Sequence, residues 1–270
     1  MEACIVDEPT HLTVQSSGGK SATLEAFLSQ YIKYSATSRT FVETDTWEFV
    51  SATGPLPPMT AAFTPSCHGT CTASSTFPTG RSIKVGDVIT WTSTFTDGTT
   101  TQHLDEIDYH ASISVVGGGT WTSSDWNSPS YRCDDQVGSY AGCVSYYGQP
   151  SLNTMALLPA IAANIRTVQT NGSLHYGLVG VGRPLTRDTS AQRANRRAAC
   201  PPPGPQPAGT TCDEYPFATT REGAANPNSA PPNSGSVWAP EAEQNSQAGY
   251  ISSFVQNERV LEGDQYWVAV

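Results

Sequence analysis

The chain has 270 residues, of which 14% are charged and 37% hydrophobic, and its formal net charge at pH 7 is −10. This length accommodates one large domain or two modest ones, and the lack of eighteen consecutive apolar residues predicts no membrane span. The acidity argues against a strongly basic nucleic-acid-binding surface. It is uneven, however: residues 1–130 carry 5 Lys+Arg and 13 Asp+Glu, whereas residues 131–270 carry 9 and 11.

The N-terminal region has two predicted parts. Residues 1–20 show little pattern and end in Ser-Ser-Gly-Gly, which is typical of a loop. Ser21 could cap a helix that runs to about Ser35, because apolar residues recur at helical spacing on one face: Leu24, Phe27, Leu28, Tyr31 and Ile32. We therefore predict an N-terminal segment, residues 1–39, with one helix.

The hydrophobic period changes to two from Thr40 onward. Segments rich in Thr, Val, Ile and Trp are separated by Gly, Pro and Asp-Gly turn signals; they cover residues 40–52, 82–95, 102–116 and 120–126. The pattern predicts an antiparallel β-rich domain, sandwich-like or barrel-like, over residues 40–130, whose role is unknown. Its aromatic residues could form a glycan-binding face, but a sheet core is the favoured explanation. His103 and His110, close to Asp105, are predicted to lie on the surface.

Helical periodicity returns in residues 131–270. A helix is predicted over Asn153–Thr170, with its regular part beginning near Leu158 because Pro159 is tolerated only in a first turn, and Asn171-Gly172 supplies its end. A short helix follows over residues 189–199, capped by Asp188 or Thr189. After two Pro-rich or Asn-rich loops, a helix over residues 241–255 and a strand over residues 265–270 complete the chain.

Seven cysteines indicate an oxidising compartment. Six of them form three close sequential pairs, which we expect to be short disulfide loops, and Cys4 is left over: the pairs are Cys67 and Cys71, Cys133 and Cys143, and Cys200 and Cys212. A zinc site at residues 67–71 (CHGTC) is the alternative for the first pair, although no second ligand pair with zinc spacing follows. The first residues lack the features of a signal peptide, so we expect either a leader missing from this sequence or another export route.

Two neighbouring carboxylates, Asp213 and Glu214, are the main candidates for chemistry. Adjacent residues of a strand point to opposite faces, so only one of them can face a given site. Glu243 opens the helix that follows about thirty residues later. A strand carboxylate that faces a helix carboxylate could hold a divalent cation, and the spare carboxylate could take a proton from an attacking water. The alternative is a solvated pair together with a Glu that complements a helix dipole.

These residues also carry a family resemblance. Residues 212–223 (CDEYPFATTREG) resemble the C-D-E-Y-P-F-A-S-T … E-G signature of the NucA/NucB-type secreted deoxyribonucleases, and residues 243–249 (EQNSQAG) are similar to the E-N-x-x-Q-G-G stretch of that family. The ending DQYWVAV also fits. Upstream, residues 131–135, 158–166, 175–177 and 194–200 resemble the long form found in actinobacteria. The resemblance covers about residues 130–270.

The resemblance implies a ββα-metal nuclease domain over residues 131–270 and hence an α+β protein. It implies Asp213 as the general base and Glu243 as the residue that holds the metal, with Mg or Mn as the cation; Gln244 and Asn245 are further candidate ligands. Glu214 would be catalytic or structural. The family's Asn after the helix Glu is Gln244 here, and its Gly-Gly pair is Ala248-Gly249. Gln keeps the amide oxygen on a longer side chain.

The predicted function is that of a secreted, monomeric, metal-dependent endonuclease that cuts DNA without sequence specificity, with RNA as an alternative substrate. Four arginines could bind phosphate or simply form a solvated face: Arg193, Arg196, Arg197 and Arg221. His175 is expected to serve packing rather than chemistry. Two rival functions remain open, namely a toxin cargo delivered into other cells and a surface-binding protein with a degenerate nuclease domain. An inhibitor or immunity protein is neither indicated nor excluded.

Overall fold

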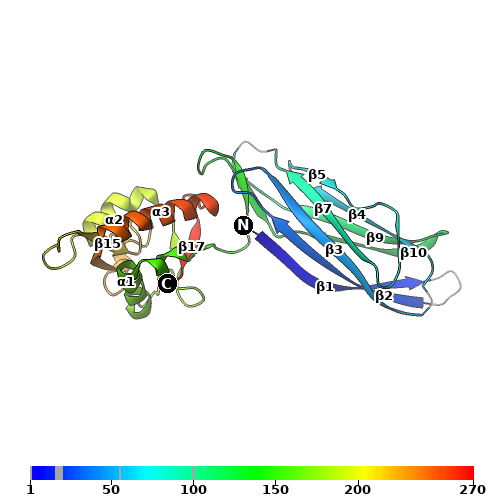
Figure 1. Ribbon diagram of the computed structural model, residues 1–270, viewed down its shortest axis with the longest axis horizontal. Coiled ribbons are helices and arrows are strands. Elements are labelled where there is room, and N and C mark those ends of the chain that lie inside the picture. Colours follow the sequence, from blue (N-terminus) through cyan, green and yellow to red (C-terminus); the bar gives the residue numbers. More distant parts are fainter. Residues whose placement is uncertain (1, 16–20, 55, 99–100) are drawn as a thin grey trace. The chain divides into compact units, whose positions relative to one another are not determined.

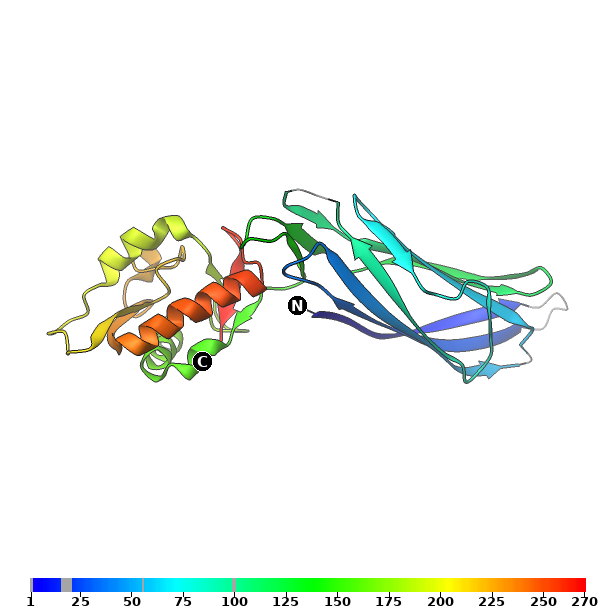
Figure 2. The ribbon, with the colours of Figure 1, turned by 45° about the horizontal axis from the view of Figure 1, so that its top comes forward.

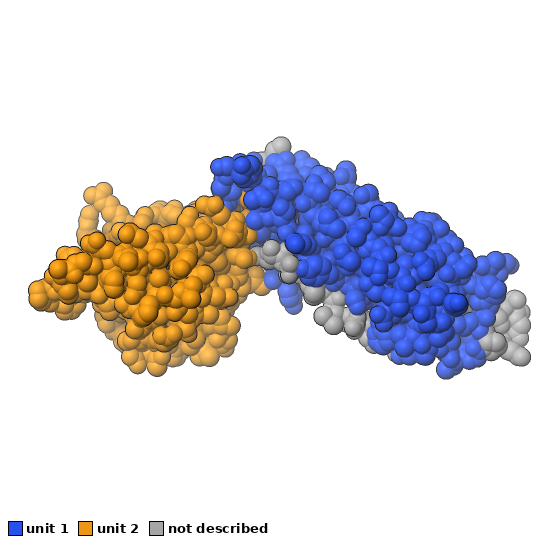
Figure 3. Space-filling model, viewed as in Figure 1, with its two compact units in different colours: residues 1–147 blue, residues 148–270 orange. Residues whose placement is uncertain are grey.

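The computed structural model describes residues 2–15, 21–54, 56–98 and 101–270. The chain divides into two compact units, residues 1–147 (unit 1) and residues 148–270 (unit 2), shown separately coloured in Figure 3. The expected boundaries at 39/40 and 130/131 do not coincide with this division. Strand pairing explains the difference, because strands on either side of each expected boundary hydrogen-bond in one sheet.

Unit 1 is built from antiparallel sheets (Figure 1). The first has the strand order β1-β2-β3-β7-β5, formed by Glu2–Gln15, Ser21–Lys33, Thr40–Thr53, Val88–Thr96 and Thr72–Ser75. The second has the order β10-β9-β4-β6, formed by Gly119–Asn127, Ile107–Val115, Met59–Cys67 and Arg81–Ile83. A third has the order β12-β11-β8, formed by Gly142–Ser145, Tyr131–Asp134 and His103–Asp105.

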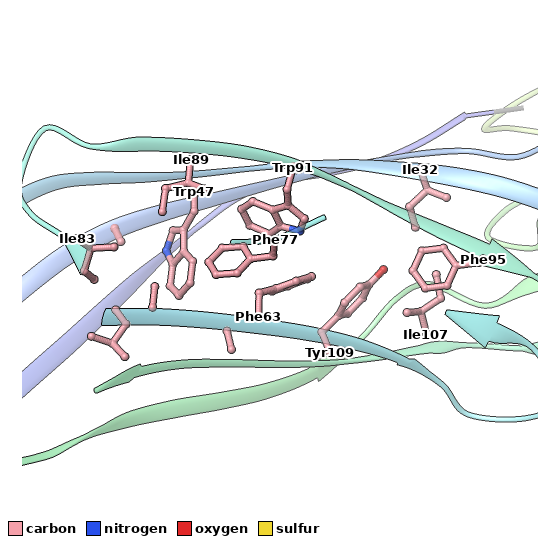
Figure 4. Packing of buried hydrophobic residues seen from close by; sticks show 14 of the residues in the cluster. Ile32, Trp47, Phe63, Phe77, Ile83, Ile89, Trp91, Phe95, Ile107 and Tyr109 are labelled. Carbon is pink, nitrogen blue, oxygen red and sulfur yellow. The ribbon is translucent and has the colours of Figure 1, made fainter. Parts of the chain in front are cut away.

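The predicted antiparallel β region is confirmed, and it is a sandwich. Alternate residues of β3 and β7 are buried, as expected for strands with one face on the core. Figure 4 shows side chains of the two larger sheets projecting toward each other. Phe63 lies at their centre, with its ring centroid 4.7 Å from that of Trp91 and 5.8 Å from that of Tyr109.

The predicted N-terminal loop and helix are wrong, because residues 2–15 and 21–33 form the paired strands β1 and β2. The apolar positions of residues 21–35 fit a period of two as well as a helical period, and Ala22, Leu24, Gln30 and Ile32 are buried on the face toward the core. Pairing with β1 and β3 decides between the two periods. The polar Gln30 on this face hid the alternation in the sequence. The side chain of Cys4 lies outside the described residues.

Replacing Phe63 by Ala should destabilise unit 1 by about 3–5 kcal/mol, because a buried ring is lost and the rigid aromatic neighbours cannot fill the space. Val88→Ala is the matched control: Val88 is 54% exposed, and its truncation should change stability by less than about 0.5 kcal/mol. Hydrogen exchange read by mass spectrometry resolves peptides of unit 1 from those of unit 2. Equal protection of β4 and β9 in the two variants would contradict the central role of Phe63.

Unit 2 combines three helices with two small sheets. The helices are α1 (Pro159–Asn171), α2 (Gln192–Ala199) and α3 (Glu241–Asn257). Short 3₁₀ helices η1, η2 and η3 span Thr154–Leu157, Thr189–Ala191 and Pro227–Ser229. The sheets are β13-β17-β14 (Ser151–Leu152, Gln265–Val268, Leu185–Thr186) and the antiparallel ribbon β15-β16 (Thr210–Tyr215, Gly235–Pro240).

The predicted elements of residues 153–270 are confirmed: the three helices lie where the sequence places them, and β17 is the terminal strand. Gly172 ends α1 and Asp188 caps the turn before α2, as expected. Among the described residues, no helix has the length and apolar character needed to cross a membrane.

Tyr215 fixes the end of β15 within unit 2. Its ring is fully buried, and its hydroxyl donates to the carbonyl of Tyr176 at 2.9 Å and accepts from Gln169 Nε2 at 3.3 Å. Gly177 has a φ of 75°, and a Cβ there would lie 2.1 Å from the Tyr215 hydroxyl. Glycine at this position is therefore required both by the backbone and by the close approach of Tyr215.

All three expected disulfides are present: Cys67–Cys71, Cys133–Cys143 and Cys200–Cys212. The zinc alternative for residues 67–71 is excluded, because both sulfurs are used in the disulfide. In unit 2, Cys200–Cys212 joins the end of α2 to the start of β15, immediately before Asp213.

Candidate active site

The β15–β16 ribbon and α3 form the centre of the site. Asp213 pairs with Val237 across the ribbon, and β16 leads directly into α3 at Glu241. Both α1 and α3 contact the ribbon (Figures 1 and 2). A strand–strand–helix unit thus brings a β15 carboxylate close to the first turns of α3.

Asp213 is almost completely buried, at 1% exposure. Three side-chain amides donate to its carboxylate: Gln244 and Gln247 of α3 reach Oδ1 at 2.8 Å each, and Asn164 of α1 reaches Oδ2 at 3.2 Å. We call these three residues the amide cradle. All three donors are neutral, so they orient the carboxylate without balancing its charge.

Burial raises the pKa of Asp213, and the hydrogen bonds from the amide cradle lower it only in part. Desolvation disfavours the ionised form, whereas the amide donors favour it. A carboxylate with a raised pKa holds a proton more tightly once it has accepted one. Asp213 therefore has a property required of a general base.

Glu214 has different partners. Its Oε1 lies 3.2 Å from Nε of Arg196 on α2. Burial raises its pKa, and the charge of Arg196 opposes that rise. Glu214 and Arg196 line a cavity of about 350 Å³, together with Arg187, Gln244 and Gln247. Gln244 and Gln247 thus contact Asp213 and also border this cavity.

Glu243 lies at the start of α3 but is directed toward α1. Its Oε2 accepts hydrogen bonds from the backbone amides of Ala160 at 2.9 Å and Ile161 at 3.2 Å. These amides are in the first turn of α1, where a negative charge is stabilising. Gln244 donates a hydrogen bond to Asp213, and Asn245 is exposed. The three predicted metal ligands therefore have three different environments.

The predicted phosphate-binding arginines are all exposed. Arg196 borders the cavity and pairs with Glu214, and Arg221 lies 3.8 Å from Asp188. Arg193 and Arg197 are on α2, and no ion pair of either is found in the described part of the chain. His175 Nδ1 donates to the backbone carbonyl of Gln169 at 2.7 Å, which matches the expected packing role.

Three residues at or near the site had no role predicted from the sequence: Asn164, Gln247 and Arg187. Asn164 had a recognisable signal: it lies three residues after Ile161 on the buried face of α1, and a polar residue there needs a hydrogen-bond partner. Gln247 falls within the stretch EQNSQAG but gave no signal of its own. Arg187 borders the cavity through the fold alone, since it follows β14.

A divalent cation is compatible with the side chains around Asp213. Asp213, Gln244 and Gln247 carry carboxylate and amide oxygens, and Glu243 adds a carboxylate in the first turn of α3. Oxygen donors of this kind suit Mg²⁺ and Mn²⁺. Cys200, Cys212 and Glu214 also lie close together, but the disulfide between the two cysteines removes their sulfurs as ligands.

One family model matches a segment of this part of the chain. Residues 180–269 match the model of a family described as Deoxyribonuclease NucA/NucB. The matched residues include β15, β16, α3 and β17, and hence Asp213, Glu214 and Glu243. The predicted relation to the NucA/NucB nucleases is confirmed for this segment, which is about three quarters of unit 2.

Two solved structures are also similar to part of the chain. One is the yeast GGA1 GAE domain–P21 structure, at 14% identity over 38% of this chain and 90% of that one, with a TM-score of 0.27. The other is the GAE domain of GGA2p from Saccharomyces cerevisiae, at 10% identity over 44% and 98%, also with a TM-score of 0.27. A TM-score this low supports no conclusion about fold or function. No curated protein matches the chain.

Proposed function

We propose that unit 2 is a metal-dependent endonuclease that hydrolyses DNA without sequence specificity, with RNA as a second substrate. The observation that carries the proposal is Asp213, which lies inside the segment matched to the nuclease family. It is a buried carboxylate with a raised pKa and is held by neutral amides. The order of β15, β16 and α3 supports a ββα-metal type of active site.

In the proposed mechanism Asp213 is the general base. Its carboxylate takes a proton from the water that attacks the phosphorus atom, while the amide cradle keeps the carboxylate in one orientation. The raised pKa helps Asp213 to retain this proton until the leaving oxygen has separated. Glu214 holds Arg196 beside the cavity, where the guanidinium can contact a phosphate oxygen.

Glu243, Gln244 and Asn245 are the proposed holders of Mg²⁺ or Mn²⁺, and the contacts of Gln244 with Asp213 favour Gln244 over Asn245. A bound cation would stabilise the negative charge that develops on the phosphoryl oxygens. Oε2 of Glu243 caps α1. The other carboxylate oxygen of Glu243 would hold the cation.

Substrate binding through phosphates fits the charge distribution. Residues 148–270 contain 8 arginines and 9 acidic residues, a net of −1, so attraction to DNA must come from local arginines rather than from the whole unit. Arg193, Arg196, Arg197 and Arg187 lie on or near α2 and the cavity, and Arg221 is a more distant candidate. Contacts to the DNA backbone carry no sequence information, which supports non-specific cleavage.

An extracellular site of action is supported by the three disulfides, which persist in oxidising compartments. The same observation is compatible with secretion and with delivery into other cells.

Digestion of plasmid DNA and single-stranded RNA by the purified chain tests this function. Cleavage is expected with Mg²⁺ or Mn²⁺ and should cease with excess EDTA, because the cation supplies most of the charge stabilisation. Unrelated plasmids should give smears without shared discrete fragments. An intact substrate with a folded protein under both metals would contradict nuclease activity, whereas discrete shared fragments would contradict only the lack of specificity.

A further inference from the structure

A cluster of three potential metal ligands lies in unit 1, in a sequence region separate from the nuclease segment. Asp97 follows β7, and His103 and Asp105 belong to β8. One ligand atom of each residue lies within 4.8 Å of the others. We propose that these three side chains form a zinc-binding site that stabilises unit 1, and this proposal is independent of the nuclease function.

The backbone places the three side chains together by pairing. His103 and Asp105 are two residues apart on β8, so their side chains share one face of the strand. Their register partners on β11 are Cys133 and Tyr131. The amide of Asp97 donates to the carbonyl of Arg39 at 3.1 Å, which fixes the end of β7. The cluster is thus built on paired strands rather than on a free loop.

The distances and the ligand types fit zinc. His103 Nδ1 lies 3.3 Å from Asp97 Oδ2. Two ligands at the usual Zn–N and Zn–O distances of about 2.0–2.2 Å are separated by roughly 3.3–3.5 Å in a tetrahedral site. Imidazole nitrogen and carboxylate oxygen are both among the ligands that zinc takes in proteins, and a water can complete the tetrahedron.

The charges of the cluster favour a cation. Asp97 and Asp105 are 2% and 6% exposed, and two buried carboxylates so close together repel each other in a medium of low polarity. The described donors to Asp105 are all neutral: the amides of Gly69 and Glu106 and the hydroxyl of Tyr131. A bound Zn²⁺ would offset the repulsion between the two carboxylates.

The disulfide loop of residues 67–71 closes over the cluster. The amide of Gly69 donates to Asp105 Oδ2 at 3.1 Å. A Cβ at Gly69 would lie 2.7 Å from that oxygen and 3.1 Å from Cε1 of His103. Only glycine at this position lets the loop come close enough for its backbone amide to hydrogen-bond to Asp105. Hydrogen bonds of this kind orient the side chains that bind a metal.

Titration of the full-length chain with Zn²⁺, after treatment with EDTA, tests the proposal. Long-range ¹H–¹⁵N spectra report each histidine ring, and we expect Nδ1 of His103 to shift with one equivalent of zinc. None of the proposed ligands of the nuclease site is a histidine, so this signal reports unit 1 alone. An unshifted His103 ring in the unaltered protein would overturn the proposal, whether or not any variant folds.

Variants give a second readout. Asp105→Asn should weaken zinc affinity by more than the roughly 10–100-fold that loss of an outer contact costs, and it should abolish the zinc-dependent rise in the thermal unfolding temperature of unit 1. Asp125→Asn is the matched control, because Asp125 pairs with His110 at 2.6 Å on the exposed side of the sheet. Equal zinc affinity of the two variants would identify Asp97–His103 as an ordinary ion pair.

Discussion

Asp213→Asn is expected to lower kcat for DNA cleavage by about 10²–10⁴-fold, the usual contribution of a general base, while unit 2 stays folded. The substitution keeps the size of the side chain and removes its ability to accept a proton. With its amide oxygen in the place of Oδ1, the new side chain keeps the hydrogen bonds from Gln244 and Gln247 and loses only the one from Asn164. The change is therefore directed at proton transfer rather than at packing.

The stability of this variant distinguishes a functional carboxylate from a structural one. Burial raises the pKa of Asp213 in the folded chain, so its contribution to stability is present below the unfolded pKa of about 3.9 and is lost as the pH rises through the folded pKa. At pH 7 the ionised side chain is a net cost. Asp213→Asn should then leave unfolding of unit 2 unchanged or make it less favourable.

Single-turnover cleavage rates and thermal unfolding of the same preparations measure both effects. Glu241→Gln is the control, because Glu241 is exposed at the first position of α3, and its rate should equal that of the unaltered chain. Glu243→Gln should reduce both metal affinity and stability, since Glu243 also caps α1. A fully active Asp213→Asn protein would refute the assignment of the base.

The second large effect is a loss of unit 1 stability with rising pH. Glu43 and Asp45 are completely buried on the core face of β3. Burial raises the pKa of both carboxyl groups, and the charge of Asp45 raises that of Glu43 further. Gln30 donates to both, and Tyr109 donates to Glu43 at 2.7 Å. Two adjacent acids in this core retain protons that the unfolded chain releases.

The sign of the effect follows from the raised folded pKa values. The contribution of the pair is complete below about pH 4, where the unfolded groups also bind protons, and it is lost progressively above that pH. Each extra proton bound by the folded state lowers the free energy of unfolding by about 1.4 kcal/mol per pH unit. We therefore expect unit 1 to be markedly less stable at pH 8 than at pH 5.

Denaturant unfolding between pH 5 and pH 8, read by hydrogen exchange of unit 1 peptides, measures this slope. Glu43→Gln and Asp45→Asn should each reduce it, because each removes one titrating group. Glu48→Gln is the control on the same strand, since Glu48 is exposed, and it should keep the full slope. A stability of unit 1 that rises from pH 5 to pH 8 would show that the pair is ionised in the folded state.

Local periodicity predicted unit 2 better than unit 1. Helices α1 and α3 have end signals within a few residues, such as Pro159 and Gly172 for α1. Strand β2 has no such signal, and its pairing with β1 and β3 overrides the helical spacing of its apolar residues. The boundary near residue 130 was misplaced for the same reason, since the pairing of β11 with β8 is not encoded near either strand.

The candidate site was predictable where its residues are neighbours in sequence. Asp213 and Glu214 form a short recognisable run, and Glu243 opens a helix. The amide cradle was not predictable, because Asn164 and Gln247 are 49 and 34 residues from Asp213 in sequence. The capping of α1 by Glu243 spans 83 residues and was equally inaccessible. Only the fold brings these groups together.

The two neighbouring carboxylates of β15 differ in how their charge is compensated. Glu214 has Arg196 as a counter-ion, whereas Asp213 is held by neutral amides alone. An uncompensated carboxylate attracts cations and repels a polyanion. If unit 2 acts as proposed, cation and nucleic acid must bind synergistically, each raising the affinity for the other by the same factor. The apparent affinity for DNA should then depend on the cation concentration even before any bond is cut.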